Sequence, residues 1–405
     1  MKKKKLRIGI LFGGRSGEHE VSLLSAASIL KAIDRNKHDV TPIGITKQGR
    51  WVTSGDAQAL LNGNTAPENP RLAGNPETTP TAAVIRRGEA VIVPPVPANS
   101  LQPLEISAVA ELAPAQPALS LDVVFPVLHG TFGEDGTIQG LFELADIAYV
   151  GSGVLGSAAG MDKAAMKQMF AAVGIPQTPY LAMLRSEWRD NPKKATKKIE
   201  AALKYPLFVK PANLGSSVGI SKVHDRKELA PAMDLAASFD RKLIIEQGVG
   251  GPGVKPRELE VAVLGNDDPE ASVVGEIVPG AEFYDYEAKY LSDSSVPIIP
   301  AKLSTAESKE IRQMAIAAFK ACDCAGLARV DFLMEPARPA KKGKPAKKAK
   351  IYLNEINTLP GFTSISMYPK LWAATGLPYK KLIDRLIQLA IERHGEKQQT
   401  TFSRS

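Results

Sequence analysis

Cysteine is nearly absent from this sequence of 405 residues, which contains only Cys322 and Cys324. Two cysteines cannot build a disulfide framework for a chain of this size, so we expect the protein to work in the reducing cytoplasm.

The sequence also lacks a run of apolar residues long enough to span a membrane. The uncharged segment 147–161 contains four glycines and is shorter than the roughly 20 apolar residues that a spanning helix needs. The lysine-rich start leads at 7–12 into too few apolar residues for a secretory signal, and we expect a first β-strand there.

The sequence has no broadly distributed positive charge, although its formal net charge is +8. Four lysines lie at 2–5 and six more between 341 and 350, and without these ten charges the remainder carries a net charge of −2. Aromatic residues make up only 6% of the chain and do not alternate with a basic face, as a nucleic-acid-binding module would require. We therefore expect two solvated lysine tracts, with neither a nucleic-acid nor a membrane partner.

Residues 6–50 follow the pattern strand, loop, helix, strand. LRIGILF is a compact apolar run, GGRSGEHE is a glycine-rich turn, and VSLLSAASILKAI has apolar residues at helical spacing. DVTPIGIT then returns to a strand pattern. This βαβ order predicts a parallel sheet, with a ligand near the carboxyl ends of its strands.

Two segments depart from regular structure. Residues 67–117 hold ten of the thirty prolines, which predicts a peripheral, loop-rich insert with at most a hairpin around 83–93. Residues 336–350 are rich in alanine, proline and lysine, which predicts an exposed, mobile hairpin loop.

The rest of the chain divides into further units of helices and strands. After 152 we expect helices at 162–173 and 227–238 and strands at 206–210, 218–223 and 242–247. After 248 we expect antiparallel strands at 258–264 and 271–277, helices at 305–322 and 377–394, and a strand pair at 328–334 and 350–357. The chain is therefore predicted to be an α/β protein with three domains, at 1–151 (with an insert at about 52–119), 152–247 and 248–405.

The strand pair in the third unit carries the most informative polar residues. Alternate side chains of a strand share a face, so Arg329 and Asp331 point the same way, as do Glu355 and Asn357. If the two strands pair antiparallel, one patch presents two carboxylates, an amide oxygen and a guanidinium group. Such oxygens suit Mg²⁺ beside substrate phosphates, and a guanidinium suits charge on a transferring phosphoryl group. The alternative is a solvated polar face with surface ion pairs.

A second cluster is FVKPANLGSSVGISKV, in which a strand carrying Lys210 leads into a turn of glycine and serine. Small residues let backbone N–H groups approach phosphate oxygens, and a nearby lysine supplies positive charge. The spacing is not that of a Walker A loop, and a plain turn is the alternative. Lys163 at the start of a helix and Lys289 in FYDYEAKYLSD are further candidates for contacts with a nucleotide phosphate.

Seven ordered motifs resemble the D-alanine–D-alanine ligases of the ATP-grasp superfamily. They are GGRSGEHEVSLLSA, HGTFGEDGTIQG, GSGVLGSAAGMDK, VKPANLGSSVGISKV, FYDYEAKYLSD, LARVDF and LNEINTLPGFTSIS. The resemblance implies an N-terminal Rossmann-like domain with a parallel sheet, a small central α+β domain, and a C-terminal α+β domain with an antiparallel sheet. It covers most of the chain apart from about 52–119 and 336–350.

The resemblance also implies a reaction. ATP phosphorylates the carboxylate of one D-alanine, and the amine of a second D-alanine attacks the acyl phosphate, releasing phosphate and giving D-alanyl-D-alanine for peptidoglycan and the cell wall. Implied catalytic residues are Glu18, Ser216, Tyr290, Arg329 and Gly361. Implied substrate contacts are Glu18, His129, Arg329 and Ser366. Implied ATP contacts are Lys163, Lys210, Ser216, Ser217, Glu246, Glu258 and Lys289. Implied ligands of two Mg²⁺ or Mn²⁺ ions are Asp331, Glu355 and Asn357.

Water would hydrolyse an acyl phosphate, so we expect a lid that closes over the site. The segments 283–293 and 215–219 are the candidates for this lid, and ordinary surface loops are the alternative.

Because YDYEAKY keeps Tyr290, the chain resembles the dipeptide-forming enzymes more than those that join D-alanine to D-lactate or D-serine. Remaining alternatives are another ATP-grasp carboxylate–amine ligase and an inactive nucleotide-binding scaffold. The resemblance further implies a homodimer.

Overall fold

A computed structural model of the chain describes residues 4–62, 91–92, 100–103, 119–251, 253–278, 296–338, 340, 346–363 and 365–401. The chain forms two compact units. The first consists of Met1–Val154, Leu359–Pro369 and Leu377–Ser405, and the second of Leu155–Thr358 and Lys370–Gly376. The final helix thus clusters with the N-terminal part of the chain, and the second unit holds one sheet on each side of residue 247. The finer division into three domains stays a prediction.

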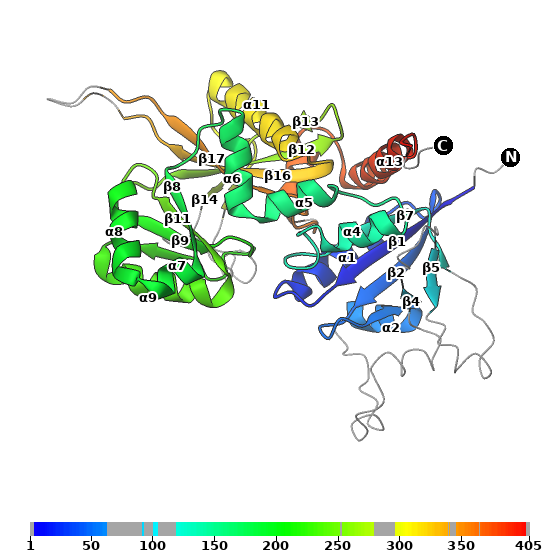
Figure 1. The fold of residues 1–405 in the computed structure, drawn as a ribbon. Helices are drawn as coiled ribbons and strands as arrows, with labels where there is room; N and C mark the ends of the chain where they lie inside the picture. The colour runs from blue at the N-terminus through cyan, green and yellow to red at the C-terminus, as the bar shows by residue number, and fades with distance from the viewer. Residues whose placement is uncertain are drawn as a thin grey trace, which may run out of the picture. The chain divides into compact units, whose positions relative to one another are not determined.

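The first unit is built on the predicted parallel strands. β1 (Leu6–Gly13) lies between β2 (His38–Ile45) and β7 (Val123–Val127) and is parallel to both, while α1 (His19–Ala32) connects β1 to β2 (Figure 1). The last six residues of β1 are all buried. Such a continuous buried run is typical of a parallel strand covered on both faces, and the predicted βαβ start is confirmed.

The sheet of the first unit includes residues from the predicted insert. β3 (Trp51–Thr53) pairs antiparallel with β2, and α2 (Ser54–Leu61) follows it, so regular structure continues to residue 61. Most of the predicted hairpin around 83–93 lies outside the described residues. The other elements of this unit are β4 (Val91–Ile92), β5 (Ser100–Pro103), β6 (Leu119–Ser120), α4 (Thr137–Leu144) and α13 (Tyr379–Lys397).

The second unit begins with an antiparallel sheet in the order β10 (Ser221–Val223), β9 (Leu207–Pro211), β11 (Lys242–Gln247), β8 (Tyr180–Leu184). Its helices are α7 (Arg185–Asp190), α8 (Pro192–Ala202) and α9 (Arg226–Phe239) (Figure 1). Sequence reasoning did not anticipate β8, α7 or α8, because β8 is a half-exposed edge strand and α8 buries only Ala195 and Ile199. The predicted strand 218–223 is shorter than expected, since Gly219 has φ +71° and extended geometry starts only after it.

The larger sheet of the second unit has the order β15 (Val296–Ile298), β14 (Gly275–Val278), β12 (Arg257–Gly265), β16 (Gly326–Glu335), β17 (Lys350–Asn357), with β13 (Glu270–Ala271) beside β12. The predicted antiparallel pairing of the last two strands is confirmed, whereas the predicted strand 271–277 is broken between β13 and β14. One face packs on α11 (Thr305–Ala321) and α6 (Lys163–Ala172), burying side chains such as Val330, Phe332 and Leu353.

Two further helices complete the described chain, α5 (Val154–Met161) and α12 (Met367–Ala374). A Ser304–Glu307 capping box starts α11, as expected for a helix whose first backbone N–H groups need acceptors. Among the described helices, none is both long enough and apolar enough to cross a membrane.

Candidate active site

A polar patch lies on β16 and β17, on the face of the sheet opposite the buried core. Asp331 is directly opposite Glu355, and Arg329 is directly opposite Asn357. Arg329 donates two hydrogen bonds to Asp331, from Nε to Oδ1 and from Nη2 to Oδ2, each 2.7 Å. The side chains of Arg329 and Asp331 are only 19% and 15% exposed, so the patch is not a solvated surface. The predicted grouping of four polar residues is therefore confirmed.

Glu260 on β12 extends this patch by one strand. It is opposite Asp331, and its Oε2 lies 3.3 Å from Nε of Arg329. Burial acts to lower the pKa of Arg329, but Asp331 and Glu260 outweigh that effect and hold the pKa well above its ordinary value. Arg329 is thus a fixed positive charge on β16, held by a carboxylate of its own strand and by one of the neighbouring strand β12.

Asp331, Glu355 and Asn357 offer two carboxylates and one amide oxygen, a donor set that suits a hard divalent cation completed by substrate oxygens. Lys163 lies close to this set, with Nζ 4.0 Å from Oε2 of Glu355. Within the described part of the chain, no group of three or more histidine, cysteine, aspartate and glutamate side chains is arranged to hold a metal by itself. The fit of the patch to a cation therefore rests on its mixed oxygen donors, and a ligand would have to supply the remaining oxygens.

Lys163 is the first residue of α6. Asp162 caps this helix by accepting hydrogen bonds from the backbone N–H groups of Ala164 and Ala165, which fixes the start of the helix and hence the position of Lys163. Nζ of Lys163 donates to the backbone oxygen of Leu214 at 2.9 Å. Lys163 therefore contacts both the glycine-serine turn that follows β9, at Leu214, and the polar patch, at Glu355 of β17.

Three charged side chains, Lys167, Lys210 and Glu246, form a cluster of ion pairs in the same unit as Lys163. Glu246 on β11 forms ion pairs with Lys167 of α6, whose Nζ lies 2.5 Å from Oε1, and with Lys210 of β9 at Oε2. The side chains of Lys167 and Glu246 are 1% and 5% exposed. Burial acts to raise the pKa of Glu246, but the two lysines lower it to about 2. The carboxylate is therefore ionised at neutral pH, and it is held from both sides.

The glycine-serine turn has an unusual backbone. Ser216 and Ser217 have φ values of +50° and +59°, in the left-handed region that few non-glycine residues adopt. Gly219 also has positive φ, and a Cβ there would approach the Phe239 ring to 2.7 Å. Left-handed serines in sequence are a form of local strain that the surroundings must maintain, and such strain is frequent at ligand-binding loops.

In the first unit, Glu18 and His129 lie close together near the ends of β1 and β7. Ser16 Oγ donates to the backbone oxygen of His129 at 2.5 Å and accepts from the backbone N–H of Glu18 at 3.2 Å. A Cβ on Gly130 would come within 2.7 Å of Glu18 Oε2, so the glycine leaves space for this carboxylate. Burial lowers the pKa of His129, and the nearby Glu18 charge opposes that shift only in part. His129 is therefore neutral at physiological pH.

A loop at 359–366 carries two more of the predicted site residues. A Cβ on Gly361 would meet Ser366 Oγ at 3.2 Å, so the two residues lie against each other. Ser366 Oγ accepts from the backbone N–H of Thr363 at 3.1 Å and lies 2.8 Å from Thr363 Oγ1. Tyr379 of α13 donates to the backbone oxygen of Phe362 at 2.6 Å, which anchors the loop to a helix.

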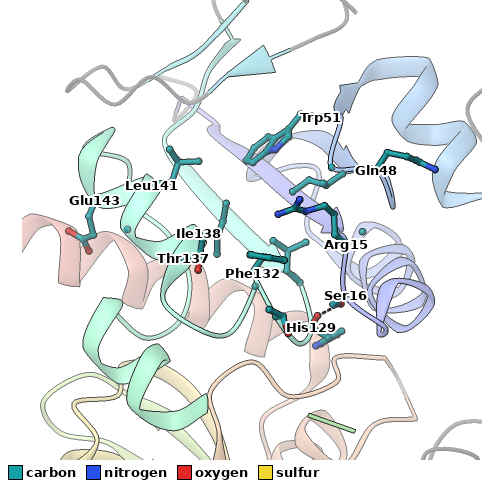
Figure 2. Close-up of a pocket in the computed structure, with 18 of the residues that line it drawn as sticks. Arg15, Ser16, Gln48, Trp51, His129, Phe132, Thr137, Ile138, Leu141 and Glu143 are labelled. Atoms are coloured by element: carbon teal, nitrogen blue, oxygen red, sulfur yellow. Dashed lines mark hydrogen bonds between the residues drawn. The ribbon is translucent and has the colours of Figure 1, made fainter. Parts of the chain in front are cut away.

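A cavity of about 850 Å³ opens at the carboxyl ends of β1, β2 and β7 (Figure 2). Its walls are largely apolar and include Trp51 and Leu141, while Arg15 lies over the Phe132 ring, 4.3 Å from its centroid. His129 forms part of one wall, as does the segment Gly13–Ser16. The cavity is at the edge of the sheet where the βαβ pattern predicts a ligand.

The predicted site residues thus fall into two groups. The second unit contains Lys163, Lys210, Ser216, Ser217, Glu246, Glu258, Arg329, Asp331, Glu355 and Asn357. The first unit contains Glu18, His129, Gly361 and Ser366. Lys289, Tyr290 and the proposed lid 283–293 lie outside the described residues.

Sequence reasoning missed three residues that the geometry brings to these groups. Lys167 is one helical turn after Lys163, and this i, i+4 spacing was the available signal. Glu260 lies two residues after Glu258 on the same face of β12. Ser25 contacts His129, and no sequence pattern connects residues 104 positions apart.

Comparison with known proteins agrees with this geometry. Residues 7–152 match the family model described as D-ala D-ala ligase N-terminus, and residues 169–388 match D-ala D-ala ligase C-terminus. The chain is 47% identical to a D-alanine–D-alanine ligase of Bacillus cytotoxicus (98% of this chain, 99% of the relative). It is 48% identical to one of Heliobacterium modesticaldum (99% and 98%).

Solved structures give the same result. The D-alanine-D-alanine ligase from Coxiella burnetii is similar with a TM-score of 0.74 and 34% identity, over 98% of this chain and 97% of that one. The VanG D-Ala:D-Ser ligase from Enterococcus faecalis is similar with a TM-score of 0.75 and 35% identity, over 96% and 100%. The chain therefore belongs to the D-alanine–D-alanine ligase family.

Proposed function

We propose that this protein joins two D-alanine molecules to D-alanyl-D-alanine while ATP is converted to ADP and phosphate, which supplies a precursor of peptidoglycan. Family membership over nearly the whole chain supports this activity. The observation that carries the chemistry is the patch of Arg329, Asp331, Glu355 and Asn357 on β16 and β17. Its carboxylate, amide and guanidinium groups are the types that phosphoryl transfer to a carboxylate requires.

Making an acyl phosphate brings two anions together, so positive charge must offset their repulsion. We assign Lys163 and Lys210 to the phosphates of ATP, together with Lys289 and the backbone of the turn at Ser216–Ser217. Glu246 and Glu258 are assigned to the adenine and ribose of the nucleotide. The pairing of Glu246 with two lysines supports this assignment, because it keeps an ionised acceptor in an otherwise buried position.

Asp331, Glu355 and Asn357 are proposed to hold two Mg²⁺ (or Mn²⁺) ions. When bound, the ions would supply positive charge that offsets the negative charge of the ATP phosphates. Arg329 holds Asp331 in one orientation through two hydrogen bonds, so this side chain is already positioned before a cation binds. Arg329 is also proposed to stabilise negative charge on the tetrahedral intermediate, as is the backbone N–H of Gly361.

Apart from Arg329, the residues assigned to the amino acids belong to the first unit. We assign the first D-alanine to Glu18 and His129, and the carboxylate of the second to Ser366. A carboxylate such as Glu18 suits the ammonium group of an amino acid. Glu18, Ser216 and Tyr290 are proposed to form a set of hydrogen bonds when the lid closes and excludes water from the acyl phosphate.

The test of this function is phosphate release from ATP and Mg²⁺ in the presence of D-alanine, with L-alanine and D-lactate as controls. We expect phosphate release with D-alanine but not with L-alanine or D-lactate, and one D-alanyl-D-alanine formed for each phosphate released. Phosphate release that does not depend on D-alanine would contradict the proposal.

A ligase that joins D-alanine to D-lactate or D-serine is the rival function, and the same assay with D-serine distinguishes it. We favour two D-alanines because the segment around Tyr290 resembles the dipeptide-forming enzymes. Replacing Tyr290 with Phe or Lys should change the ratio of D-alanine to D-lactate incorporation, whereas unchanged selectivity would refute this role of the lid. A cytoplasmic homodimer is the proposed form of the enzyme.

A further inference from the structure

Three hydrogen bonds connect His129 to the loop that carries Gly361. Nδ1 of His129 lies 3.0 Å from the backbone oxygen of Leu359, and Nε2 lies 3.2 Å from Ser25 Oγ. Ser25 Oγ in turn accepts from the backbone N–H of Phe362 at 3.3 Å. Ser25 is completely buried, and His129 is 5% exposed. One buried hydrogen-bond network therefore connects Ser25 of α1, His129 after β7 and the loop 359–362.

The chemistry of these groups gives the network one direction. A carbonyl oxygen only accepts, so the proton on the ring must be at Nδ1 and donate to Leu359. In the neutral ring Nε2 is then an acceptor, and the Ser25 hydroxyl donates to it while its oxygen accepts from Phe362. In this arrangement each of the three donors, the N–H of Phe362, the hydroxyl of Ser25 and Nδ1–H of His129, faces an acceptor, and no donor faces a donor.

The network holds the backbone on both sides of Gly361. His129 fixes the oxygen of Leu359, Ser25 fixes the N–H of Phe362, and Tyr379 fixes the oxygen of Phe362. The Phe362 ring also packs on Phe125, with ring centroids 5.9 Å apart. A peptide unit whose neighbours are held in this way has little freedom to rotate, so its N–H direction is set before substrate binds.

We propose that Ser25 is a positioning residue, which fixes the tautomer of His129 and, through Phe362, the direction of the Gly361 N–H. This inference rests on the proposed function, because it assumes that this N–H stabilises the tetrahedral intermediate. It also gives His129 a role besides contact with D-alanine. Since both ring nitrogens have protein partners, a substrate carboxylate would have to displace Ser25 to reach Nε2.

Ser22 supplies a matched control on the same helix. It is also completely buried, and its hydroxyl likewise bridges two segments: it accepts from the backbone N–H of Gly13 and donates to the backbone oxygen of Val127. Replacing either serine with alanine removes one buried bridging hydroxyl. The two variants should therefore lose similar stability, while only Ser25 contacts His129 and the 359–362 loop.

The test compares Ser25→Ala, Ser25→Cys and Ser22→Ala by steady-state kinetics and melting temperature. We expect Ser25→Ala to lower kcat roughly 10–100-fold with KM for ATP changed less than about two-fold, because a misdirected N–H affects the transition state and not nucleotide binding. Ser25→Cys keeps a weak donor and should recover part of kcat. Ser22→Ala should lower the melting temperature similarly with a much smaller effect on kcat. Equal kcat losses in the two alanine variants would overturn the proposal.

A spectroscopic measurement judges the network independently of turnover. The chain has five histidines, so ¹⁵N-histidine spectra can be assigned by replacing each in turn. We expect His129 to be the Nδ1–H tautomer and its unprotonated Nε2 resonance to shift in Ser25→Ala but not in Ser22→Ala. An Nε2–H tautomer would overturn the inference. If the wild-type protein released no phosphate with D-alanine, the proposed function would fail, and the spectra would still decide the role of Ser25.

Discussion

At the scale of single residues, the ion-pair cluster of Lys167, Glu246 and Lys210 is where we expect a substitution to cost much folding stability. Removing one partner of a buried ion pair leaves an uncompensated charge and typically costs roughly 3–5 kcal/mol. Glu246→Gln leaves both lysines without their carboxylate, so we expect it to lower the unfolding midpoint strongly, whereas Lys167→Met should cost less because Glu246 keeps Lys210 as a partner. The two changes combined should cost less than the sum of the single changes, since the double variant leaves one lysine without its carboxylate where Glu246→Gln leaves two. Urea unfolding of the four proteins measures this coupling, and additive losses would contradict it.

His129 gives a prediction for pH. Burial lowers its pKa from the ordinary value of 6.5 in the folded state, so between these two values the unfolded chain binds more protons than the folded one. The free energy of unfolding should then fall as pH decreases below about 6.5. The charge of Glu18 and the hydrogen bond to the backbone of Leu359 oppose this lowering of the pKa only in part, and Glu134 also faces the ring, with Oε1 3.9 Å from Nδ1. Melting temperatures at several pH values for wild type and His129→Asn measure the effect, and we expect a smaller slope in the variant. Identical slopes would show that another group causes the dependence.

At the scale of secondary-structure elements, the pairing of β16 with β17 brings the proposed cation ligands together. Glu355→Gln keeps the shape of the side chain and removes its charge, so we expect the Mg²⁺ concentration for half-maximal activity to rise and kcat to fall at least about 100-fold. Glu276→Gln is the matched control, because Glu276 is a buried carboxylate of the same sheet that accepts two hydrogen bonds from Arg257.

The control should lower the melting temperature without changing the Mg²⁺ requirement. Activity titrations with MgCl₂ on the three proteins check this, and an equal shift in both variants would mean that the sheet as a whole, and not the patch, sets the cation dependence.

The lysine-rich hairpin between β16 and β17 is predicted to be dispensable for turnover. Glu335 at its base is 2% exposed, and its Oε1 accepts from Lys347 at 2.8 Å and Arg338 at 3.4 Å. Deleting 339–349 removes Lys347 and leaves this carboxylate with less compensation, so we expect a lower melting temperature but kcat within about two-fold of wild type. Adding Glu335→Gln to the deletion should restore part of the stability. A large loss of kcat would assign the hairpin a functional role.

The elements also show what sequence reasoning can reach. The patch on β16 and β17 was predictable because strand side chains alternate, so Arg329 and Asp331 had to share a face once the strands paired. The parallel start of the chain was predictable from its buried run and helical spacing. Ser25 was not, because its partners His129 and Phe362 are 104 and 337 positions away and only the tertiary fold brings them together. Lys167 was missed for a related reason: a fully buried lysine is expected only once its carboxylate partner on another element is known.

At the scale of the whole molecule, the proposed nucleotide contacts belong to one compact unit and, apart from Arg329, the proposed amino-acid contacts belong to the other. Binding free energies of groups that share no partners are usually additive. We therefore expect ATP binding and D-alanine binding to respond to different substitutions. Lys210→Met should weaken binding of a non-hydrolysable ATP analogue at least about ten-fold, because it removes a cation from the proposed phosphate site. Glu246 would remain paired with Lys167 in this variant.

Glu18→Gln should have the opposite pattern. It removes the carboxylate proposed for the ammonium group of the first D-alanine, so KM for D-alanine should rise at least about ten-fold while the affinity for the ATP analogue stays within about two-fold of wild type. Lys198→Met provides a control for loss of a lysine, because Lys198 forms an exposed ion pair with Glu187 and such pairs contribute little. Calorimetric titration with the ATP analogue and Mg²⁺, together with initial rates over a range of D-alanine concentrations, measures both quantities. If Glu18→Gln weakened nucleotide binding as much as Lys210→Met, the assignment of the two ligands to separate units would be wrong.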